Sequence, residues 1–559
     1  MKKLILLLTA AVFTISCSSD LEDLNKNTKD PVEVSGEGLF AGAQKRLTDQ
    51  MITPNVNLNN NRLWVQHWNE TTYQDESNYD QVTRSIPDRH WRSMYRDVLN
   101  NLADASRVIE SIDFDLTNAQ KPNKLAIIEI LSVYAFSNLV ETFGNIPYTD
   151  ALDIDNLLPK YDDAKTIYTS LITRLDAAIA SMDSSGSFSV ADDLIYGGNA
   201  ESWKKFGNTL KLRMGVMLAD ADPALSKQIV EAAYTAGVFQ SNADDANYAY
   251  GTSAPNNNPL NDNLVLSGRN DYVAAKTLID KMNDLSDPRR ATYFDPNLNE
   301  NVGEVASVSE AGGKATITFK ANITSSPVVG NNAYVPSGDA EIPTLLGSIT
   351  AVGSNTITIE HVANTPEAGE TVLFATYKGA PVGVQSRYSD YSHANRTMVA
   401  SDLPGTILSF IEAKFLLAEA AARGYSVGSA QAHYEEAIKA SFELWGARGV
   451  DDYLAKPEVN YTTALANSNA STPWKEVIGT QAWIGLYNRT FAPYLSVRRL
   501  DYPILVKPDK NKSGFPVRYT YPVTEQNLNG VNHSAAASAI GGDTAGTLLF
   551  WDKEYTFDF

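Results

Sequence analysis

The segment from Lys124 to Phe143 constrains the fold more than any other part of this chain. Its apolar residues recur so closely that almost no polar face is left; they are Ile127, Ile128, Leu131, Val133, Ala135, Phe136, Leu139, Val140 and Phe143. A helix that is apolar on nearly every side must be surrounded by other elements. Gly144 and Pro147 follow where such a helix would end. The segment therefore predicts a buried helix inside a largely helical body.

Helical periodicity continues through most of the chain. In the first half, further helices are expected over 161–181, 200–219, 224–235 and 271–282. In the second half, one helical face is marked by residues that step by three and four: Leu408, Ile411, Phe415, Ala418 and Ala422. A new helix is expected to open near Ser429. These patterns predict a body in which successive helices pack together.

Two of these helices share a spacing of small and aromatic residues. The pattern Ala-x3-Tyr-x2-Ala at 430–437 resembles the second helix of a tetratricopeptide unit, where a small residue lets the paired helix approach. Residues 164–171 repeat the spacing with Leu in the third place. The same steps occur in many helical cores, so each motif alone is weak. Together they predict a mainly α, tetratricopeptide-like helix-pair scaffold.

The signal changes between residues 299 and 380. Short alternating runs replace the helical period; they are Ala315–Phe319, Ser348–Val352, Thr356–Glu360 and Thr371–Phe374. Turn dipeptides such as Gly312-Gly313 and Gly353-Ser354 separate or flank these runs. Because the helical pattern resumes afterwards, we expect a small β-rich domain at 299–380, inserted into a helical body of residues 35–298 and 381–559.

The N-terminus has the features of an export signal. Met1-Lys2-Lys3 is positive, and the apolar run from Leu4 to Ile15 is shorter than the roughly 20 residues needed to span a bilayer. Cys17, the only cysteine, follows at once. We expect residues 1–16 to be a signal peptide, Cys17 to be lipidated, and residues 17–34 to be a polar tether. We expect no other segment to cross a membrane.

Charge and motifs exclude several functions. A formal net charge of −20 disfavours nucleic acid as a ligand. No metalloprotease, serine-hydrolase, phosphate-loop or cysteine-metal motif occurs, and the six histidines lack metal-ligand spacing. Acidic doublets such as Asp192-Asp193 and Asp451-Asp452 could supply hydrolase carboxylates, but adjacency in sequence does not give the required distance in space. We therefore expect a non-enzyme without cofactor or metal.

The strongest binding feature is an aromatic cluster at 64–79. Aromatic faces stack on sugar rings or apolar side chains, while amides and carboxylates fix orientation by hydrogen bonds. The candidate ligand contacts in this cluster are Trp64, Trp68, Tyr73, Asp75, Asn78 and Tyr79. Trp64 and Trp68 are four residues apart, so one buried helical face explains them equally well. We expect the other four to be core residues less often than the two tryptophans.

Two further segments are weaker candidates. An Asn-rich run at 256–263 continues to Arg269-Asn270, and its Pro and Asn residues favour a polar loop. Asn263 and Arg269 are the candidate contacts from this loop. Where the chain leaves the β-rich segment, Tyr388 and Tyr391 are the candidates. Such loops are more often simply solvated.

Six ordered segments resemble motifs of the SusD/RagB-like family, in particular its variant group. They are the Trp…Asn-x-Leu-x-Leu-Arg helix at Ser202–Met214, the Asp-Pro-Arg turn at Leu285–Arg289, the Ala-Glu-rich helix at Glu412–Ala420, the Gln-x-Trp-Ile helix at Gln481–Tyr487, the Arg-Arg exit at Arg498–Pro503 and the closing Tyr-Pro…Glu…Asn segment at Tyr519–Asn529. None of them is specific alone, but six in order behind a lipoprotein signal are hard to produce by chance. The resemblance excludes 299–380.

The resemblance implies both an architecture and a role. The architecture is an all-α tetratricopeptide-bearing scaffold with a loop-rich ligand face. The role is that of a surface-exposed outer-membrane lipoprotein, which binds an oligosaccharide or oligopeptide and acts as a lid on a SusC-type TonB-dependent β-barrel transporter. The motifs are mainly structural, so no binding residue is carried over from the family. Two alternatives stay open: a surface enzyme that hydrolyses glycans or peptides, and an adhesion protein acting through its β-insert.

Overall fold

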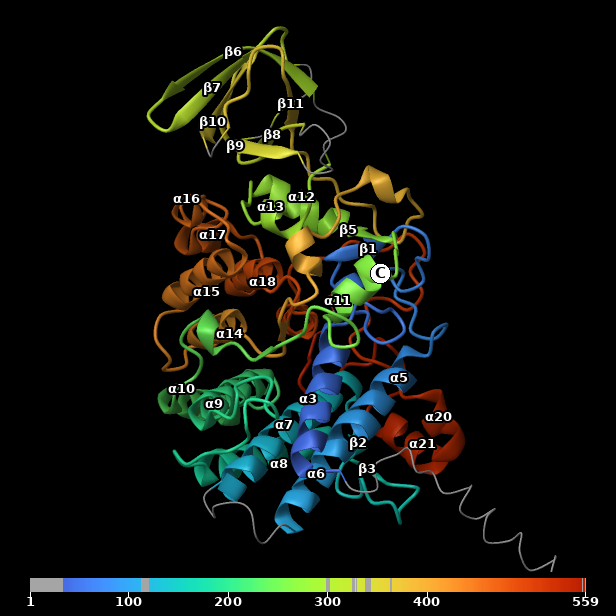
Figure 1. Cartoon of the computed structure of the whole chain (residues 1–559). Coiled ribbons are helices and arrows are strands. Elements are labelled where there is room, and N and C mark those ends of the chain that lie inside the picture. Colours follow the sequence, from blue (N-terminus) through green and yellow to red (C-terminus); the bar gives the residue numbers. More distant parts are fainter. Residues whose placement is uncertain are drawn as a thin grey trace, which may run out of the picture.

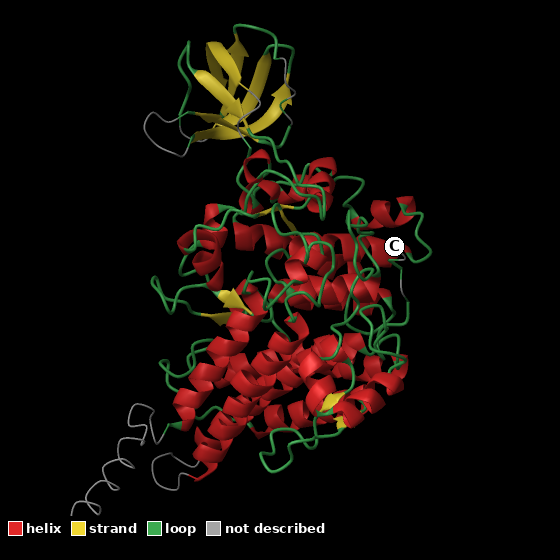
Figure 2. Ribbon diagram, turned by 90° about the vertical axis from the view of Figure 1, so that its right-hand side faces the viewer, coloured by secondary structure: helices red, strands yellow, loops and turns green. Residues whose placement is uncertain are grey.

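The computed structural model describes residues 34–111, 120–297, 302–323, 327, 329–336, 343–361, 364–554, 556–557 and 559. The expected signal peptide, Cys17 and nearly all of the expected tether lie outside these residues. A helical body carries a small β-structure at one end (Figures 1 and 2). This arrangement confirms the expected fold class.

Helix α7, Gln120–Phe143, lies in the core of the body. Nineteen of its 24 side chains are buried. It packs against α6 (Asn100–Ser111), α8 (Ala164–Ser181) and α9 (Ala200–Met217). By length and hydropathy α7 could cross a membrane, which corrects the expectation that no segment after the leader could. Its most apolar window is 89% buried within the protein, so its apolar surface is used for core packing.

The remaining α-helices of the body come before and after the β-structure in the chain. In the first half they are α3 (Gly36–Ile52), α4 (Asn61–Trp64), α5 (Ile86–Arg92), α10 (Pro223–Ala236), α11 (Pro259–Asn261), α12 (Lys276–Asp284) and α13 (Arg290–Tyr293). In the second half they are α14 (Phe410–Ala422), α15 (Ala430–Trp445), α16 (Val450–Leu454), α17 (Tyr461–Asn467), α18 (Pro473–Gly485), α19 (Phe491–Leu500), α20 (Val523–Leu528) and α21 (Gly530–Ala539). Segment Ser93–Leu99 continues α5 as a π-helix.

The helix pair α14–α15 forms as its sequence predicts. The Ser409 hydroxyl accepts from the Glu412 amide at the start of α14, and Ser429 does the same for Ala432 at the start of α15. Tyr434 and Ala437, the aromatic and small residues of the tetratricopeptide-like spacing, are both fully buried. The small residue leaves room for α14, which packs against α15.

Two expected helices begin later than their sequences indicate. The first residues of 161–181 form β3 (Tyr161–Asp162), which pairs with β2 (Ile146–Pro147). The first residues of 271–282 form β5 (Tyr272–Ala274), which pairs antiparallel with β1 (Trp68–Glu70). Each strand forms because it pairs with a segment elsewhere in the chain. The local periodicity of the sequence does not indicate this pairing. A third short pair joins β4 (Asn247–Tyr248) to β12 (Gly405–Thr406).

The β-structure is a closed antiparallel barrel. Its strands are β6 (Val302–Ala311), β7 (Lys314–Phe319), β8 (Asn332–Val335), β9 (Thr344–Val352), β10 (Thr356–His361) and β11 (Thr371–Phe374), in the order β10-β7-β6-β11-β8-β9. Each of the four alternating runs found in the sequence lies in a strand, and β6 and β8 were missed. The barrel has a hydrophobic core of its own, formed by residues such as Ile317, Ile357 and Phe374.

Short contacts fix the barrel to the body. The chain leaves the body at Asn297 and re-enters at Thr376, and these two residues form an antiparallel bridge with an N–H···O distance of 2.8 Å. Arg290 of α13 donates to the side-chain oxygen of Asn331, which in turn donates to the Ala375 carbonyl at 2.9 Å. The Arg290 guanidinium also lies 5.2 Å from the ring centre of Tyr377. We call the Asn297–Thr376 bridge with these contacts the neck.

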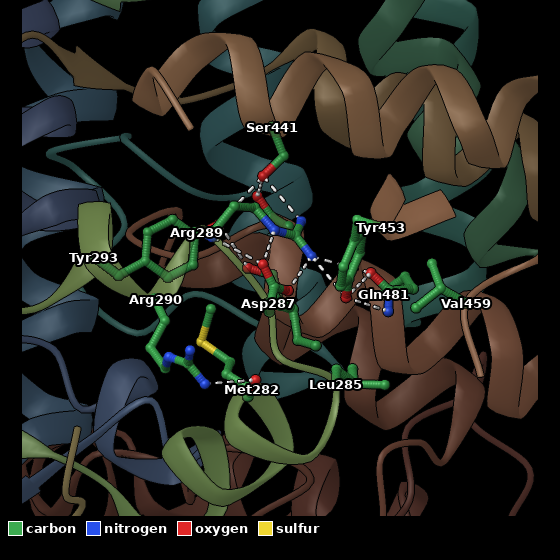
Figure 3. Close-up of polar contacts among 12 residues, drawn as sticks. Met282, Leu285, Asp287, Arg289, Arg290, Tyr293, Ser441, Tyr453, Val459 and Gln481 are labelled. Atoms are coloured by element: carbon green, nitrogen blue, oxygen red, sulfur yellow. Dashed lines mark hydrogen bonds and ion pairs between the residues drawn. The ribbon is translucent and has the colours of Figure 1, made fainter. Parts of the chain in front are cut away.

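The Asp-Pro-Arg turn lies in the core rather than at a surface site. Asp287 and Arg289 are fully buried and form a bidentate pair at 2.6 and 3.0 Å (Figure 3). The guanidinium also donates to Ser441 of α15 at 3.2 Å and to Gln481 of α18 at 3.1 Å. The motif therefore joins distant helices, and its role is structural.

Candidate ligand-binding face

The β1–β5 pair brings three loops together. Thr71, directly after β1, donates its amide to the Asp271 carbonyl at 2.8 Å and accepts from the Ser386 amide at 3.0 Å. Ala274 of β5 donates to the Ser392 carbonyl at 2.8 Å. The segments 71–79, 262–271 and 385–395 therefore meet next to this sheet, below the barrel in Figure 1; the second begins with the π-helix Asp262–Leu266 and the third contains the 3-10 helix Tyr388–Asp390. We call this region the loop face.

Both candidate tryptophans lie in the core, which corrects their assignment as ligand contacts. Trp64 is fully buried and packs edge-on against Tyr494 and Tyr519, with ring centres at 5.7 and 5.1 Å. Trp68 donates its ring N–H to the Tyr487 hydroxyl at 2.7 Å and lies under the Arg62 guanidinium. Trp64 ends α4 and Trp68 begins β1, so both are buried but they do not share one helical face.

Asn78 and Tyr79 are also buried, so they too are withdrawn as ligand contacts. The Asn78 side chain donates to the Gly383 carbonyl at 3.0 Å and accepts from the Lys510 amide at 2.6 Å. The Tyr79 hydroxyl accepts from Gln66 at 2.8 Å. Both residues serve to hold the loop in place, because their polar atoms are engaged within the protein.

Tyr73 and Asp75 are the accessible residues of the first loop. The Tyr73 side chain is 60% exposed, and Asp75 is half-buried. Gln74, between them, donates to the carbonyls of Thr71 and Thr72 at 2.9 and 2.8 Å. These hydrogen bonds fix the backbone on both sides of Tyr73. The Tyr73 ring is therefore available to stack on a ligand.

The second loop contributes one accessible cation. Arg269 is partly exposed, pairs with Asp271 at 2.7 Å and lies 5.0 Å from the ring centre of Tyr272. Asn263 is partly buried, and its side-chain amide donates to the Pro259 carbonyl at 2.8 Å. Arg269 thus belongs to the loop face, whereas the Asn263 amide is engaged within its own turn.

The third loop carries two partly exposed tyrosines. Tyr388 stacks face to face on His393, with ring centres 3.8 Å apart and an angle of 5° between the planes. Tyr391 lies under the Lys378 ammonium at 5.7 Å. Burial raises the pKa of the Tyr388 hydroxyl, and the nearby Asp295 and Asp271 carboxylates add to the effect. Tyr388 therefore stays a neutral hydrogen-bonding group at neutral pH.

Sequence reasoning missed the carboxylates beneath this face. Glu70 and Glu76 are fully buried. Burial raises the pKa of Glu70 well above its usual range, and the neighbouring Glu76 raises it further. The Ser77 hydroxyl donates a hydrogen bond to one carboxylate oxygen of Glu70, and Arg84 forms an ion pair with Glu76 at 2.5 Å. Among the described residues, no group of three or more His, Cys, Asp or Glu side chains is arranged to hold a metal ion.

A groove adjoins the loop face and was also missed. It has a volume of about 300 Å³, and no sequence signal marked it because three distant segments build it. It is lined by Lys276, Thr277, Asp280, Pro381, Val382, Val384, Val506, Lys507 and Asp509. Val382 is next in the chain to Gly383, whose amide donates to Asn69 of β1 at 2.9 Å. The groove and the loop face therefore both adjoin the β1–β5 strand pair.

The helix-pair body with its loop face defines a ligand-binding scaffold. A family model described as "Starch-binding associating with outer membrane", of the SusD-like group, matches residues 27–336 and 359–522. These ranges cover most of the chain, so the chain belongs to the SusD-like family. A search of curated protein sequences gave no match.

Solved structures agree with this assignment at the level of the fold. A chitin-binding protein superposes with a TM-score of 0.68 at 24% identity, over 93% of this chain and 100% of its own. A SusD homologue from Bacteroides thetaiotaomicron superposes at 0.65 with 22% identity, over 94% and 100%. A chitin-binding SusD homologue from Flavobacterium johnsoniae superposes at 0.66 with 21% identity, over 92% and 99%.

Proposed function

We propose that this protein is a surface-exposed, lipid-anchored protein of the outer membrane. In this role it binds an oligosaccharide and delivers it, as a lid, to a SusC-type TonB-dependent transporter. The family description names starch binding and outer-membrane association, and two structural neighbours are described as chitin-binding. These descriptions favour glycan over peptide as the ligand.

The observation that carries the proposal is the set of accessible aromatic rings on the loop face. Tyr73, Tyr388 and Tyr391 come from two distant loops that share one hydrogen-bonded framework. Tyrosine rings stack on the apolar faces of sugars, and their hydroxyls reach sugar oxygens. Asp75 and Arg269 supply an acceptor and a donor at the same face. Such a surface suits a neutral, hydroxyl-rich oligomer.

Titration calorimetry with maltooligosaccharides and chitooligosaccharides tests the ligand class. We expect Tyr73→Ala and Tyr388→Ala each to weaken glycan binding about tenfold, which corresponds to the loss of about 1.4 kcal/mol of stacking. Tyr234→Ala is the matched control, because this tyrosine is 38% exposed on α10, outside the loop face. Equal losses in all three variants, or tight binding of oligopeptides in place of glycans, would contradict the proposal.

Detergent extraction tests the partner and the anchor. We expect the chain to leave the outer membrane only with detergent, with acyl chains on Cys17, and to copurify with a large β-barrel transporter. Recovery as a lone, unlipidated protein would refute this part of the proposal. Glycan binding would be unaffected by that result.

A binding protein fits the loop face better than an enzyme does. Glycoside hydrolysis requires two carboxyl groups that reach the scissile bond. The neighbouring pair Glu70 and Glu76 lies beneath this face and is fully buried, so a substrate cannot reach that pair. Incubation with glycan panels checks this expectation, since turnover abolished by one carboxylate substitution would show an enzyme.

A further inference from the structure

One residue closes the base of the loop that carries Tyr73. Glu70, the last residue of β1, donates its amide to the Ser77 hydroxyl at 3.1 Å. In return, one carboxyl oxygen of Glu70 accepts from the Ser77 hydroxyl at 3.2 Å and from the Ser77 amide at 3.3 Å. Residues 71–76 therefore form a loop whose two ends are joined by these three hydrogen bonds. The position of the Tyr73 ring on the loop face depends on this closure.

Glu70 is one of three buried carboxyl groups in this region, and it is the one that lacks a cation. Glu70 and Glu76 are 0% exposed and Asp271 is 5% exposed. Glu76 pairs with Arg84 at 2.5 Å, and Asp271 pairs with Arg269 at 2.7 Å. Within the described part of the chain, Glu70 forms no ion pair. Burial of an ionised carboxylate without a cation is strongly unfavourable.

Each of the three carboxyl groups also has one oxygen without a hydrogen-bond donor. Among the described residues these atoms are Oε1 of Glu70, Oε2 of Glu76 and Oδ1 of Asp271. A proton on Glu70 would turn one of these unsatisfied acceptors into a donor and remove the unpaired charge. Burial raises the pKa of Glu70 well above its usual range, and the Glu76 and Asp271 carboxylates raise it further against the hydrogen bonds from Ser77. The geometry and the charges therefore both favour a neutral Glu70.

The side chains that act electrostatically on Glu70 come from its own loop and from the segment that leads into β5; they are Glu76, Asp271, Arg269 and Tyr272. Tyr272 lies opposite Glu70 in the β1–β5 pair, and burial beside Glu70 raises the pKa of its hydroxyl well above its usual range. The Arg269 guanidinium is engaged by Asp271. The third segment adds Tyr388, which is neutral as well. None of these groups supplies Glu70 with a cation of its own.

We propose that Glu70 carries a proton in the folded protein and, in this neutral form, is a positioning residue of the loop face. The inference rests on the proposed function, because it takes the loop face as the glycan site and adds its regulation. Neutral Glu70 keeps the 71–76 loop closed, so the Tyr73 ring stays where it can stack on the glycan. Loss of the proton places a third negative charge beside Glu76 and Asp271, and the repulsion opens the loop. Glycan binding therefore weakens at alkaline pH.

The direction of this pH effect follows from the raised pKa. In the open loop Glu70 meets water, where the pKa of a glutamate is about 4.3. The closed loop holds the proton to a much higher pH, so closure is most favourable below about pH 4 and weakens as the pH rises toward the pKa of the closed form. Between the two pKa values, each pH unit lowers the closing constant about tenfold. The apparent glycan affinity falls with the fraction of closed loop.

Titration calorimetry at several pH values tests the inference with maltooligosaccharides and chitooligosaccharides. Between pH 6.5 and pH 9.5 we expect the affinity of the unmodified chain to fall at least about tenfold. In Glu70→Gln, a neutral mimic of the protonated acid, the affinities at the two pH values should differ less than about threefold. Glu201→Gln is the matched control, because Glu201 is 68% exposed on α9 and its profile should follow that of the unmodified chain. Parallel losses in Glu70→Gln and the unmodified chain would overturn the inference.

Glu76→Gln is a second variant, which tests the inference even if Glu70→Gln fails to fold. Removal of the neighbouring charge lowers the pKa of Glu70, so the closed loop tolerates the ionised form better. We expect a smaller loss of affinity at pH 9.5 than in the unmodified chain. An equal or larger loss would contradict the role of Glu70.

Two measurements without glycan separate this inference from the proposed function. At pH 8.5, amide hydrogen exchange in residues 71–77 should be faster in the unmodified chain than in Glu70→Gln, and the difference should shrink at pH 6.5. If this difference is present and no glycan binds at any pH, the proposed function fails and the proton on Glu70 stands. Thermal unfolding with calcium chloride or a chelator is the other measurement. Stabilisation by calcium of the unmodified chain but not of Glu70→Gln would show that a cation serves Glu70, and would overturn the inference.

Discussion

Arg289 shows how one residue can connect distant parts of the fold. Its guanidinium is fully buried, pairs with Asp287 and reaches side chains on α15 and α18 (Figure 3). It also lies 5.0 Å from the ring centre of Phe442. A buried ion is tolerated only when its donors are satisfied, and here the Asp287 carboxylate and the polar side chains around it provide that satisfaction.

Replacing Arg289 should therefore destabilise the protein strongly. Arg289→Ala leaves the Asp287 carboxylate buried without its cation, and we expect a loss of roughly 3–5 kcal/mol in the free energy of unfolding. Urea-induced unfolding followed by circular dichroism measures it. Arg387→Ala is the control, because Arg387 is 80% exposed and pairs with Asp390 only at 3.8 Å; a change below about 0.5 kcal/mol is expected there. Similar effects of the two changes would contradict a structural role for the Asp-Pro-Arg turn.

Asp552 makes stability depend on pH. Burial raises the pKa of its carboxyl to about 8, and Asp501 adds to the effect against the opposing Arg498. The unfolded chain ionises this group near pH 3.9 and the folded chain only near 8. The folded state holds the extra proton between these values, so this contribution to stability is complete below about pH 4 and is lost as the pH rises toward 8.

Asp552→Asn should remove this dependence. We expect the fall in unfolding free energy between pH 5 and pH 8.5 to be smaller in the variant by at least about 1 kcal/mol. Denaturant unfolding at both pH values gives the difference. Parallel pH profiles of the variant and the unmodified chain would show that the Asp552 carboxyl is ionised in the folded state at neutral pH.

Single residues also show which predicted site residues the fold leaves accessible and which it buries. Sequence reasoning proposed Tyr73, which is exposed, and Tyr388, which is partly exposed, because aromatic residues in polar, irregular segments are less often buried. It could not separate these from Trp64 and Tyr79, whose segments have the same composition but whose side chains face the core. Which way a loop side chain points depends on partners such as Gln66 and Gly383, and these are fixed only by tertiary structure.

At the scale of elements, regular helices were predictable and strands were predictable only in part. The helices over α7, α14 and α15 follow from unbroken periodicity, and α14 and α15 also from their serine N-caps. Strand β6 was missed because a bulge between Val305 and Ser307 interrupts its alternation. Strands β3 and β5 were assigned to helices because only their distant partners make them strands.

The hairpin between β9 and β10 gives a prediction for the barrel. Gly347 of β9 has no room for a side chain, since a Cβ there would lie 1.8 Å from the Glu360 carbonyl oxygen. Gly347→Ala should destabilise the barrel by about 2 kcal/mol or more and speed amide exchange in β9 and β10. Hydrogen-exchange mass spectrometry measures this locally.

Gly42→Ala provides the matched control for the barrel substitution. Gly42 lies inside α3 with nothing within 4 Å of the added carbon, so alanine should stabilise the helix by up to about 1 kcal/mol. Unchanged exchange in the Gly347 variant would mean that β9 can shift away from Glu360 without cost to the barrel.

At the scale of the whole molecule, two separate hydrophobic cores lie on either side of the neck. The larger core fills the helical body, and the smaller one fills the barrel; among the described residues no buried side chain belongs to both. Packing within the body therefore rests mainly on the body's own side chains, with Tyr334 of β8 also packed against the body core. The neck supplies polar contacts between the two parts.

Removing the barrel should thus leave the body folded. In a variant with residues 298–375 replaced by two glycines, we expect one cooperative thermal transition and unchanged glycan affinity. Scanning calorimetry and titration calorimetry provide the two readouts. Aggregation of the variant would show that the barrel stabilises the body, and loss of ligand binding would favour the alternative in which the barrel itself carries the function.

The neck has a consequence for engineering. Because Asn297 and Thr376 are hydrogen-bonded neighbours, the chain leaves the body and returns to it at almost the same point. A foreign domain whose own termini lie close together could be spliced in here without redirecting the helices on either side. A fluorescent reporter at this junction would sit at the barrel end of the body, remote from α20 and α21 (Figure 1). The protein could thus be followed by fluorescence while α20, α21 and the loop bonded to them stay unmodified.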